Sequence, residues 1–244
     1  MRSGNPVLKS NTFEVAPAGE RMTLGGTVNK TGILLALVLI TAGATWGRFY
    51  DHGGNPAAIM PLVWGGCIGG LIAALVTVFK KEWAGITAPV YALLEGLVVG
   101  GLSAIFEARY PGIVIQAVGL TFGTLASLLL AYKSGLIKAT ENFKLGVVAA
   151  TGAIALLYLA NIVMSLFGHP IGFIHESGPL GIAFSGVVVV IAALNLVLDF
   201  DFIEGGVENG APKYMEWYGA FGLVVTLIWL YLEILRLLSK LRSR

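Results

Sequence analysis

Seven long runs of apolar residues constrain this chain more than any other feature of its sequence. A helix needs about 20 residues to cross the hydrocarbon core of a bilayer, and each run is close to that length. Because lipid offers backbone polar groups no partners, runs of this kind cross a membrane as helices. The sequence therefore predicts an all-α integral membrane protein with seven transmembrane helices. The expected spans are Gly32–Tyr50, Ala57–Phe79, Ile86–Phe106, Gly112–Tyr132, Leu145–Phe167, Leu180–Leu198 and Trp217–Leu238.

The composition also indicates a membrane environment. Hydrophobic residues make up 56% of the 244 residues, and charged residues make up 12%. That charged share is about half of what a soluble domain carries, so lipid must act as the solvent for much of the surface. The lipid bilayer is therefore an expected partner, and the net charge of +2 does not indicate nucleic acid. The single cysteine, Cys67, excludes a disulfide framework.

The first thirty residues are of mixed polar character, with no apolar core near Met1. We expect residues 1–30 to form a cytoplasmic N-terminal tail and residues 31–244 to form the seven-helix transmembrane domain. With seven spans, ten Lys and Arg residues fall on the side of the N-terminus and six on the other side, which predicts a cytoplasmic N-terminus. The basic end of the chain, from Ser239 onward, also favours the cytoplasm, so the side of the C-terminus stays open.

Glycines gather in the second and third expected spans. In lipid, helices associate mainly through close packing, and small residues at a contact allow two backbones to approach. We therefore expect these glycines to lie at helix contacts and not in a ligand-binding loop. They are Gly65, Gly66, Gly69, Gly70, Gly96, Gly100 and Gly101.

Acidic residues inside the expected spans are the main candidates for function, because a charge in the bilayer is costly. Glu95 lies near the middle of the third span, Asp199 ends the sixth, and Glu233 lies in the last. Snorkelling at helix ends would also explain Asp199 and Glu233, and a hydrogen-bonded structural carboxyl would explain Glu95. Asp201, two residues beyond Asp199, is expected at the water interface.

Helical phase favours an internal position for these acids. A spacing of seven residues places small and polar side chains on one face of each of the last two spans. Lipid gives such side chains no partners, so we expect both faces to point toward the interior of the bundle or a wet cavity. The two sets are Ser185, Ala192 and Asp199 on the sixth span, and Gly219, Thr226 and Glu233 on the last.

Three segments together resemble the Bax inhibitor family of membrane proteins, in its bacterial branch. The end of the sixth span, ALNLVLDFDFIE, resembles the family's Tyr-Asp-Thr-Gln-x-Ile ending, with Asp199 at the aspartate and Ile203 at the isoleucine. The fourth span carries Gln116, Ala117 and Thr121, similar to the family's Gln-Ala-x-x-x-Thr signature. The last span, LYLEILRLL, resembles a Leu-Tyr-Leu-Asp segment in which glutamate replaces aspartate.

The resemblance implies a fold and an activity. The fold would be a seven-helix bundle with the last helix surrounded by the other six, in a bacterial plasma (inner) membrane. The activity would be a pH-sensitive calcium leak, in which Asp199 and Glu233 share a proton and a basic residue, Lys80, holds the closed form. Calcium would then be the permeating ion, passing near Asp199, and no cofactor is expected.

The position of the second acid has an alternative. Glu233 lies about 16 residues into its span, roughly 24 Å from the end at which Asp199 is expected. Aligning the basic ILRLL end with the family instead places Thr226 at the acid position. Glu216, at the start of the span, is then the acid nearest to Asp199.

Two other kinds of function are open. The family resemblance also allows a non-conducting regulator that binds a membrane protease or another membrane protein. An enzyme is not expected, because His169 and His175 lie outside the spans and Ser185 lacks a Gly-x-Ser-x-Gly frame. The two histidines and Glu176 could bind a metal, but their spacing in a short loop is typical of ordinary loop residues.

Overall fold

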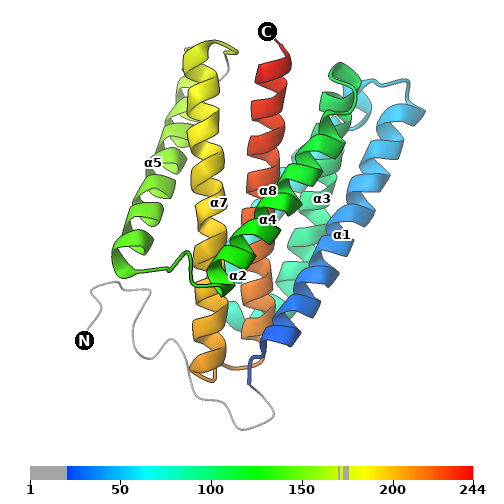
Figure 1. The fold of residues 1–244 in the computed structure, drawn as a ribbon. Helices are drawn as coiled ribbons and strands as arrows, with labels where there is room; N and C mark the ends of the chain where they lie inside the picture. The colour runs from blue at the N-terminus through cyan, green and yellow to red at the C-terminus, as the bar shows by residue number, and fades with distance from the viewer. Residues whose placement is uncertain (1–20, 170, 173–175, 244) are drawn as a thin grey trace. The chain divides into compact units, whose positions relative to one another are not determined.

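The computed structural model describes residues 21–169, 171–172 and 176–243. This part of the chain forms seven long α-helices and two short 3-10 helices (Figure 1). The long helices are α1 (Leu24–Asp51), α2 (Met60–Phe79), α3 (Ala84–Arg109), α4 (Ile113–Lys133), α5 (Glu141–Leu166), α7 (Pro179–Glu208) and α8 (Met215–Arg242). The short ones are η1 (Pro56–Ala58) and η2 (Lys81–Trp83).

Seven helices in the described residues are long and apolar enough to cross a membrane. The predicted fold class, an all-α membrane protein with seven spans, is thereby confirmed. The last helix, α8, has the largest buried share: 56% of its most apolar stretch is buried, against 44% or less for each of the others. This burial agrees with the expectation that the last helix is surrounded by other helices.

Several helices extend beyond the spans that hydropathy predicts. α1 begins at Leu24, where the side chain of Thr23 caps it by accepting a hydrogen bond from the Gly26 amide. Residues 24–30 are therefore helical, although we expected them in the N-terminal tail. α7 continues to Glu208, so Asp199 lies within this helix and not at its end. Hydropathy detects only the part of a helix inside the hydrocarbon, and polar turns beyond it give no such signal.

The chain divides into two compact units. The first comprises Met1–Gly101 and Asp201–Val224, and the second comprises Leu102–Phe200 and Val225–Arg244. Helices α3, α7 and α8 each contribute residues to both units. Asp199 and Glu233 consequently belong to the second unit, and Glu216 belongs to the first.

In the first unit, α1 and α3 pack closely at glycines. A Cβ atom added to Gly96 would lie 2.4 Å from the carbonyl oxygen of Val38, and one added to Gly100 would lie 2.2 Å from that of Ala42. A Cβ atom on Gly66 of α2 would meet the α3 backbone at 2.6 Å. Only glycine permits these approaches, so the expected role of the glycines is confirmed at these positions.

One end of the first unit brings together the start of α1, the end of α7 and the start of α8. Met22, Ile203, Ala211 and Met215 form a buried apolar cluster there. The backbone amide of Met22 donates a hydrogen bond of 2.7 Å to the carbonyl oxygen of Ala211. The segment before α1 is thus fixed against the connection between α7 and α8.

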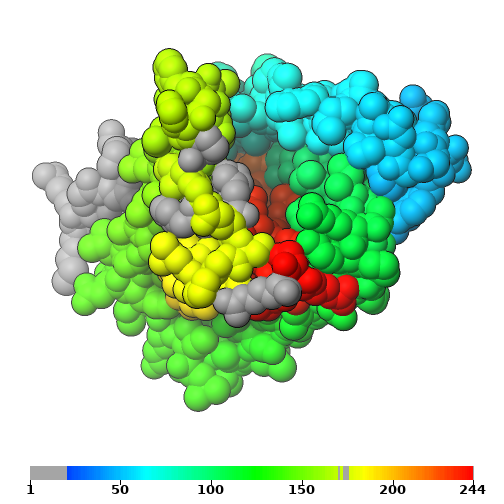
Figure 2. All heavy atoms as spheres, turned by 90° about the horizontal axis from the view of Figure 1, so that it is seen from above, coloured from blue at the N-terminus to red at the C-terminus, as the bar shows by residue number. Residues whose placement is uncertain are grey.

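In the second unit, polar contacts hold the C-terminal end of α8. The Arg242 guanidinium donates to the carbonyl oxygen of Pro111 at 2.7 Å and to Oε1 of Gln116 at 3.0 Å. The Ser243 hydroxyl bonds to that of Ser177 at 2.6 Å. Figure 2 shows this red end of α8 beside the green start of α4 and the yellow start of α7. The C-terminus therefore lies on the side of the α3–α4 turn, as seven spans require.

Candidate functional site

Asp199 is a carboxyl group without a full set of partners. It lies in α7, and the Thr226 hydroxyl of α8 is within hydrogen-bonding reach of it. Its Oδ2 atom is buried and has no hydrogen-bond partner among the described residues. Buried polar atoms are nearly always hydrogen-bonded, so an exception of this kind requires an explanation, such as a proton, a water or an ion. Asp199 is therefore the acid of the second unit whose environment is incomplete.

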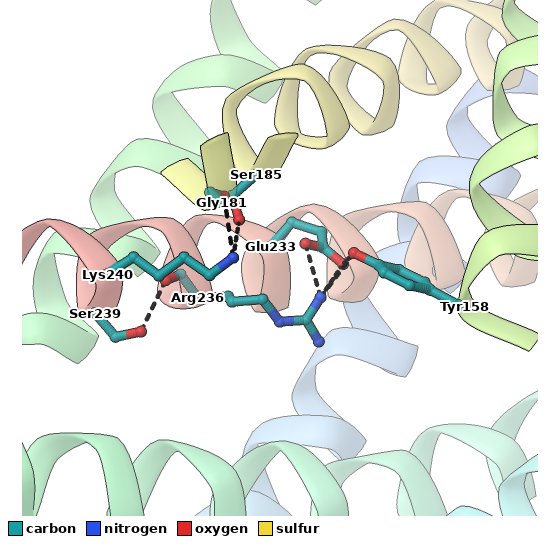
Figure 3. A network of polar contacts seen from close by, with 7 residues as sticks. All are labelled: Tyr158, Gly181, Ser185, Glu233, Arg236, Ser239 and Lys240. Carbon is teal, nitrogen blue, oxygen red and sulfur yellow. Dashed lines mark hydrogen bonds and ion pairs between the residues drawn. The ribbon is translucent and has the colours of Figure 1, made fainter. Parts of the chain in front are cut away.

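Glu233, in contrast, has a complete set of partners. Its carboxylate forms an ion pair with Arg236, one turn further along α8, whose Nη1 lies 2.8 Å from Oε1 and 3.0 Å from Oε2. The Tyr158 hydroxyl of α5 donates to Oε1 at 3.0 Å and accepts from the same guanidinium at 2.8 Å. Figure 3 shows Arg236 reaching both Glu233 and Tyr158. A cation and a hydroxyl thus neutralise and satisfy this buried acid.

The two acids contact different parts of α8. Thr226 is the polar residue of α8 beside Asp199, and Glu233 lies seven residues further along the helix. At 1.5 Å per residue this separation is about 10 Å along the axis. Thr226 is the residue that the alternative alignment placed at the position of the second acid. Its contact with Asp199 agrees with the expectation that Glu233 lies too far along α8 to meet Asp199.

The small and polar residues of the last two spans are buried at most of the predicted positions, although Asp199 is only half-buried and apolar Val188, Leu196 and Val197 are buried as well. Ser185 and Ala192 are buried in α7, while Val187 and Val190 on other faces are more than half exposed. Thr226 and Glu233 are buried in α8. The same spacing of seven, continued once more along α8, reaches Lys240.

Lys240 is a buried cation, whereas the sequence indicated only that it belongs to the basic end of the chain. It is 4% exposed, and its ammonium group donates to the carbonyl oxygen of Gly181 at 3.0 Å and to the Ser185 hydroxyl at 2.9 Å. Figure 3 shows it directed at the first turns of α7. Three basic residues near the chain end, Arg236, Lys240 and Arg242, therefore make specific contacts within the second unit. For Lys240, the seven-residue spacing that continues from Thr226 and Glu233 was the signal that could have indicated this role.

Glu216 has partners of its own in the first unit. It lies in the first turn of α8 and is 1% exposed. Its Oε1 accepts hydrogen bonds from the backbone amide of Thr23 at 3.0 Å and from the Thr23 hydroxyl at 2.9 Å. Its Oε2 forms an ion pair with Lys30 of α1. A Cβ atom added to Gly26 would lie 2.1 Å from Oε1, so a larger residue there would displace the Glu216 carboxylate. Glu216 therefore joins the starts of α1 and α8.

Glu95 and Asp201 are both half-buried within helices. Glu95 lies in α3 against α2, with its Oε2 atom 3.2 Å from where a Cβ on Gly70 would stand. Asp201 lies inside α7, two residues beyond Asp199, and a step of two residues turns a helix by about 200°. The two aspartates of α7 therefore point to nearly opposite faces.

Lys80, the expected latch, is exposed and stands at the end of α2. Its neighbour Lys81, in η2, has its ammonium group 5.4 Å from the centre of the Tyr218 ring of α8. Within the first unit, the basic residue that contacts α8 from this turn is thus Lys81.

No group of three or more His, Cys, Asp or Glu residues that could hold a metal ion occurs within residues 21–169, 171–172 and 176–243. His175, one member of the loop set considered from the sequence, lies outside the described residues.

These features define a polytopic membrane protein whose helices hold several acidic side chains between them. The sequence profile of the family described as Bax inhibitor 1 like matches residues 5–243, nearly the whole chain, and the chain belongs to that family. The match confirms the resemblance inferred from the motifs around Asp199, Gln116 and Glu233. No curated protein and no solved structure matches the chain.

Proposed function

We propose that this protein is a pH-sensitive cation leak that conducts calcium across a bacterial plasma membrane, with its N-terminus in the cytoplasm. Protonation of Asp199 controls the leak. The observation that carries the proposal is the buried Oδ2 atom of Asp199, which has no hydrogen-bond partner in the described part of the chain. Family membership supports the same activity.

Asp199 suits this role because its two protonation states place different demands on the surrounding helices. The ionised carboxylate is a charge within a membrane helix, and it is stable only near water, a cation or hydrogen-bond donors. The protonated carboxyl is neutral and carries a donor of its own. Each state favours a different packing of α7 against α8 at Thr226. A change of pH then shifts the population of two arrangements, as in other acid switches.

Glu233 has a different part in this proposal. Its charge is matched by Arg236 at 2.8 Å and its remaining acceptor capacity is used by Tyr158. The adjacent cation and the hydroxyl donor hold this carboxylate between α8 and α5. Glu233 therefore anchors α8 to α5, and the response to pH rests on Asp199. The protein carries out no enzymatic reaction in this proposal.

Calcium flux in reconstituted liposomes tests the proposal. Purified protein is inserted into vesicles that contain a calcium dye, and flux is measured between pH 5 and pH 8. Asp199→Asn removes the titratable group, and its flux should be independent of pH. Asp201→Asn is the matched control, because it makes the same change two residues away on another face of α7, and its pH profile should follow the wild type.

Two results would contradict the proposal. An Asp199→Asn variant with the pH profile of the wild type would exclude Asp199 as the sensor. Wild-type vesicles without flux above empty vesicles would exclude conduction. The second result would favour the other role that the family resemblance allows, a membrane regulator that binds a membrane protease or another membrane protein.

A further inference from the structure

A polar pocket of about 370 Å³ lies at the end of the first unit where α1 and α8 begin. Its volume falls within the range of small-molecule sites, roughly 300–1,000 Å³. Three parts of the chain build it: the segment before α1, the first two turns of α1, and the connection from α7 into α8. The residues that line it are Arg21, Thr23, Gly26, Lys30, Lys213 and Glu216.

The lining of this pocket is predominantly positive. It carries three basic side chains, Arg21, Lys30 and Lys213, and one acidic side chain, Glu216. Glu216 is nearly fully buried and is paired with Lys30, so one of the three cations is neutralised and the lining as a whole stays positive. Lys213 is exposed at the rim. The net field in the pocket therefore favours an anion, and the first turn of α1 adds to it through its helix dipole.

The pocket is rigidly framed on the side of Arg21. The segment that carries this residue pairs with Pro212 in an isolated β-bridge. Gly210 has a φ of +66°, and the Arg21 side chain lies within van der Waals contact of it, 3.5 Å from the position of an added Cβ. A glycine in this left-handed conformation lets the α7–α8 connection turn close against Arg21. The backbone that carries Arg21 is thus held against the α7–α8 connection.

The face of α1 that lines the pocket continues, one turn further on, to an exposed apolar side chain. Gly26, Lys30 and Ile33 are spaced by four and three residues and share one face of the helix. Ile33 lies one turn deeper in the span than Lys30 and is 48% exposed. The Lys30 ammonium group also lies 5.5 Å from the centre of the Trp217 ring, and tryptophan is typical of the level of lipid headgroups. A molecule with an anionic head and an apolar tail matches this arrangement.

We propose that this pocket binds the phosphate group of an anionic phospholipid. The phosphate lies among Arg21, Lys30 and Lys213, and an acyl chain follows the face of α1 that contains Ile33. Arginine and lysine are the residues that bind phosphate oxygens in proteins. A soluble phosphate ester would use the same cations, but it would gain nothing from Ile33. The site is independent of any ion flux.

The experiment measures lipid binding to the purified full-length protein in detergent. Native mass spectrometry and thermal unfolding are recorded with phosphatidylglycerol, with phosphatidylcholine and with soluble glycerol phosphate. A ligand that binds the folded state raises the unfolding temperature in proportion to its affinity and concentration. Phosphatidylglycerol should bind and stabilise, and the other two ligands should do so much more weakly.

Variants test whether the binding uses the pocket. Lys213→Ala should weaken phosphatidylglycerol binding about fivefold. One basic residue near an anionic membrane surface contributes a binding free energy that corresponds to this factor. Lys213→Arg keeps the charge and should restore binding. Lys138→Ala is the matched control, because Lys138 is also exposed but lies in the α4–α5 connection, and it should leave binding unchanged. Glu216→Gln removes the acid that neutralises Lys30 and should strengthen binding.

The proposal is overturned if phosphatidylcholine binds as tightly as phosphatidylglycerol, or if Lys213→Ala and Lys138→Ala have equal effects. Equal affinity for glycerol phosphate and phosphatidylglycerol would exclude the lipid as the ligand. A fall in affinity with Glu216→Gln, in protein that still unfolds cooperatively, would also contradict it, because the acid would then be part of the ligand's contacts.

Discussion

Replacing Gly96 by alanine tests the packing of α1 on α3 directly. The added Cβ atom would stand 2.4 Å from the carbonyl oxygen of Val38 and 2.0 Å from the hydroxyl oxygen of Thr41, whereas ordinary contact begins at 3.4 Å. Thr41 can rotate its side chain, but the Val38 carbonyl is part of the helix backbone. The two helices must therefore separate by about 1 Å at this point. Overpacking of this kind typically costs about 1–3 kcal/mol, and a clash with backbone favours the upper part of that range.

A matched variant isolates this cost. Gly43 lies on α1, is exposed, and has nothing within 4 Å of an added Cβ atom. Gly43→Ala should therefore show only the gain in helix propensity, up to about 1 kcal/mol. Because Gly96→Ala has the same gain, the difference between the two variants measures the overpacking alone. We expect a difference of about 3 kcal/mol, or roughly 6–12 °C in unfolding temperature for a chain of this size.

Thermal unfolding in detergent, followed by circular dichroism, provides the measurement. The double variant Gly96→Ala with Gly100→Ala adds a second test. One separation of α1 from α3 relieves both clashes, so the double variant should lose less stability than the sum of the two single losses. Equal unfolding temperatures for Gly96→Ala and Gly43→Ala would contradict this packing, since α1 and α3 would not then be in contact at Gly96.

Three further predictions concern charges and topology. Glu233→Gln should lower the free energy of unfolding by about 1.5 kcal/mol, measured by thermal unfolding. This value is at the low end for hydrogen bonds to charged groups, because the Arg236 side chain is 41% exposed. Removing both charges, with Arg236→Gln added, should restore stability toward the wild type, and a further loss would show that the pair is not coupled. The topology can be tested on intact cells with variants that lack Cys67. His52→Cys should then react with an impermeant maleimide and Ser134→Cys should not, whereas the reverse labelling would place the N-terminus outside. Glu95→Gln should fold and Glu95→Lys should not, because a charge at this depth costs a few kcal/mol. Equal unfolding temperatures for the two variants would show that Glu95 does not lie in the membrane interior.

The sequence predicts those parts of the fold that depend on local patterns. Seven spans follow from runs of apolar residues, because the number of residues needed to cross a bilayer is fixed by its thickness. The buried faces of α7 and α8 follow from a spacing of seven residues, which places Ser185 with Ala192 and Thr226 with Glu233. Both properties can be read from the chain without knowledge of which helices touch.

The partners of the polar residues could not be predicted in the same way. The motif around Glu233 suggested a pair with Asp199, but the vertical offset between α7 and α8 decides which residues meet. That offset places Thr226 beside Asp199. The partner of Lys240 could not be predicted for the same reason. In the sequence this lysine indicates only on which side of the membrane the chain end lies. Its hydrogen bond to the Ser185 hydroxyl depends on how the start of α7 lies against the end of α8.

The polar contacts of α8 also have a consequence for biosynthesis. α8 ends 34 residues after α7, because α7 ends at Glu208 and α8 at Arg242, so at about 5–20 residues per second it is synthesised roughly 2–7 s later. During this interval Tyr158, Ser185 and Asp199 are already in the membrane, while Glu233 and Lys240 do not yet exist. Helices α5 and α7 thus leave these polar groups without their α8 partners until α8 arrives. A ribosome that stops early would release a chain whose unmatched hydroxyl and carboxyl groups mark it for membrane quality control.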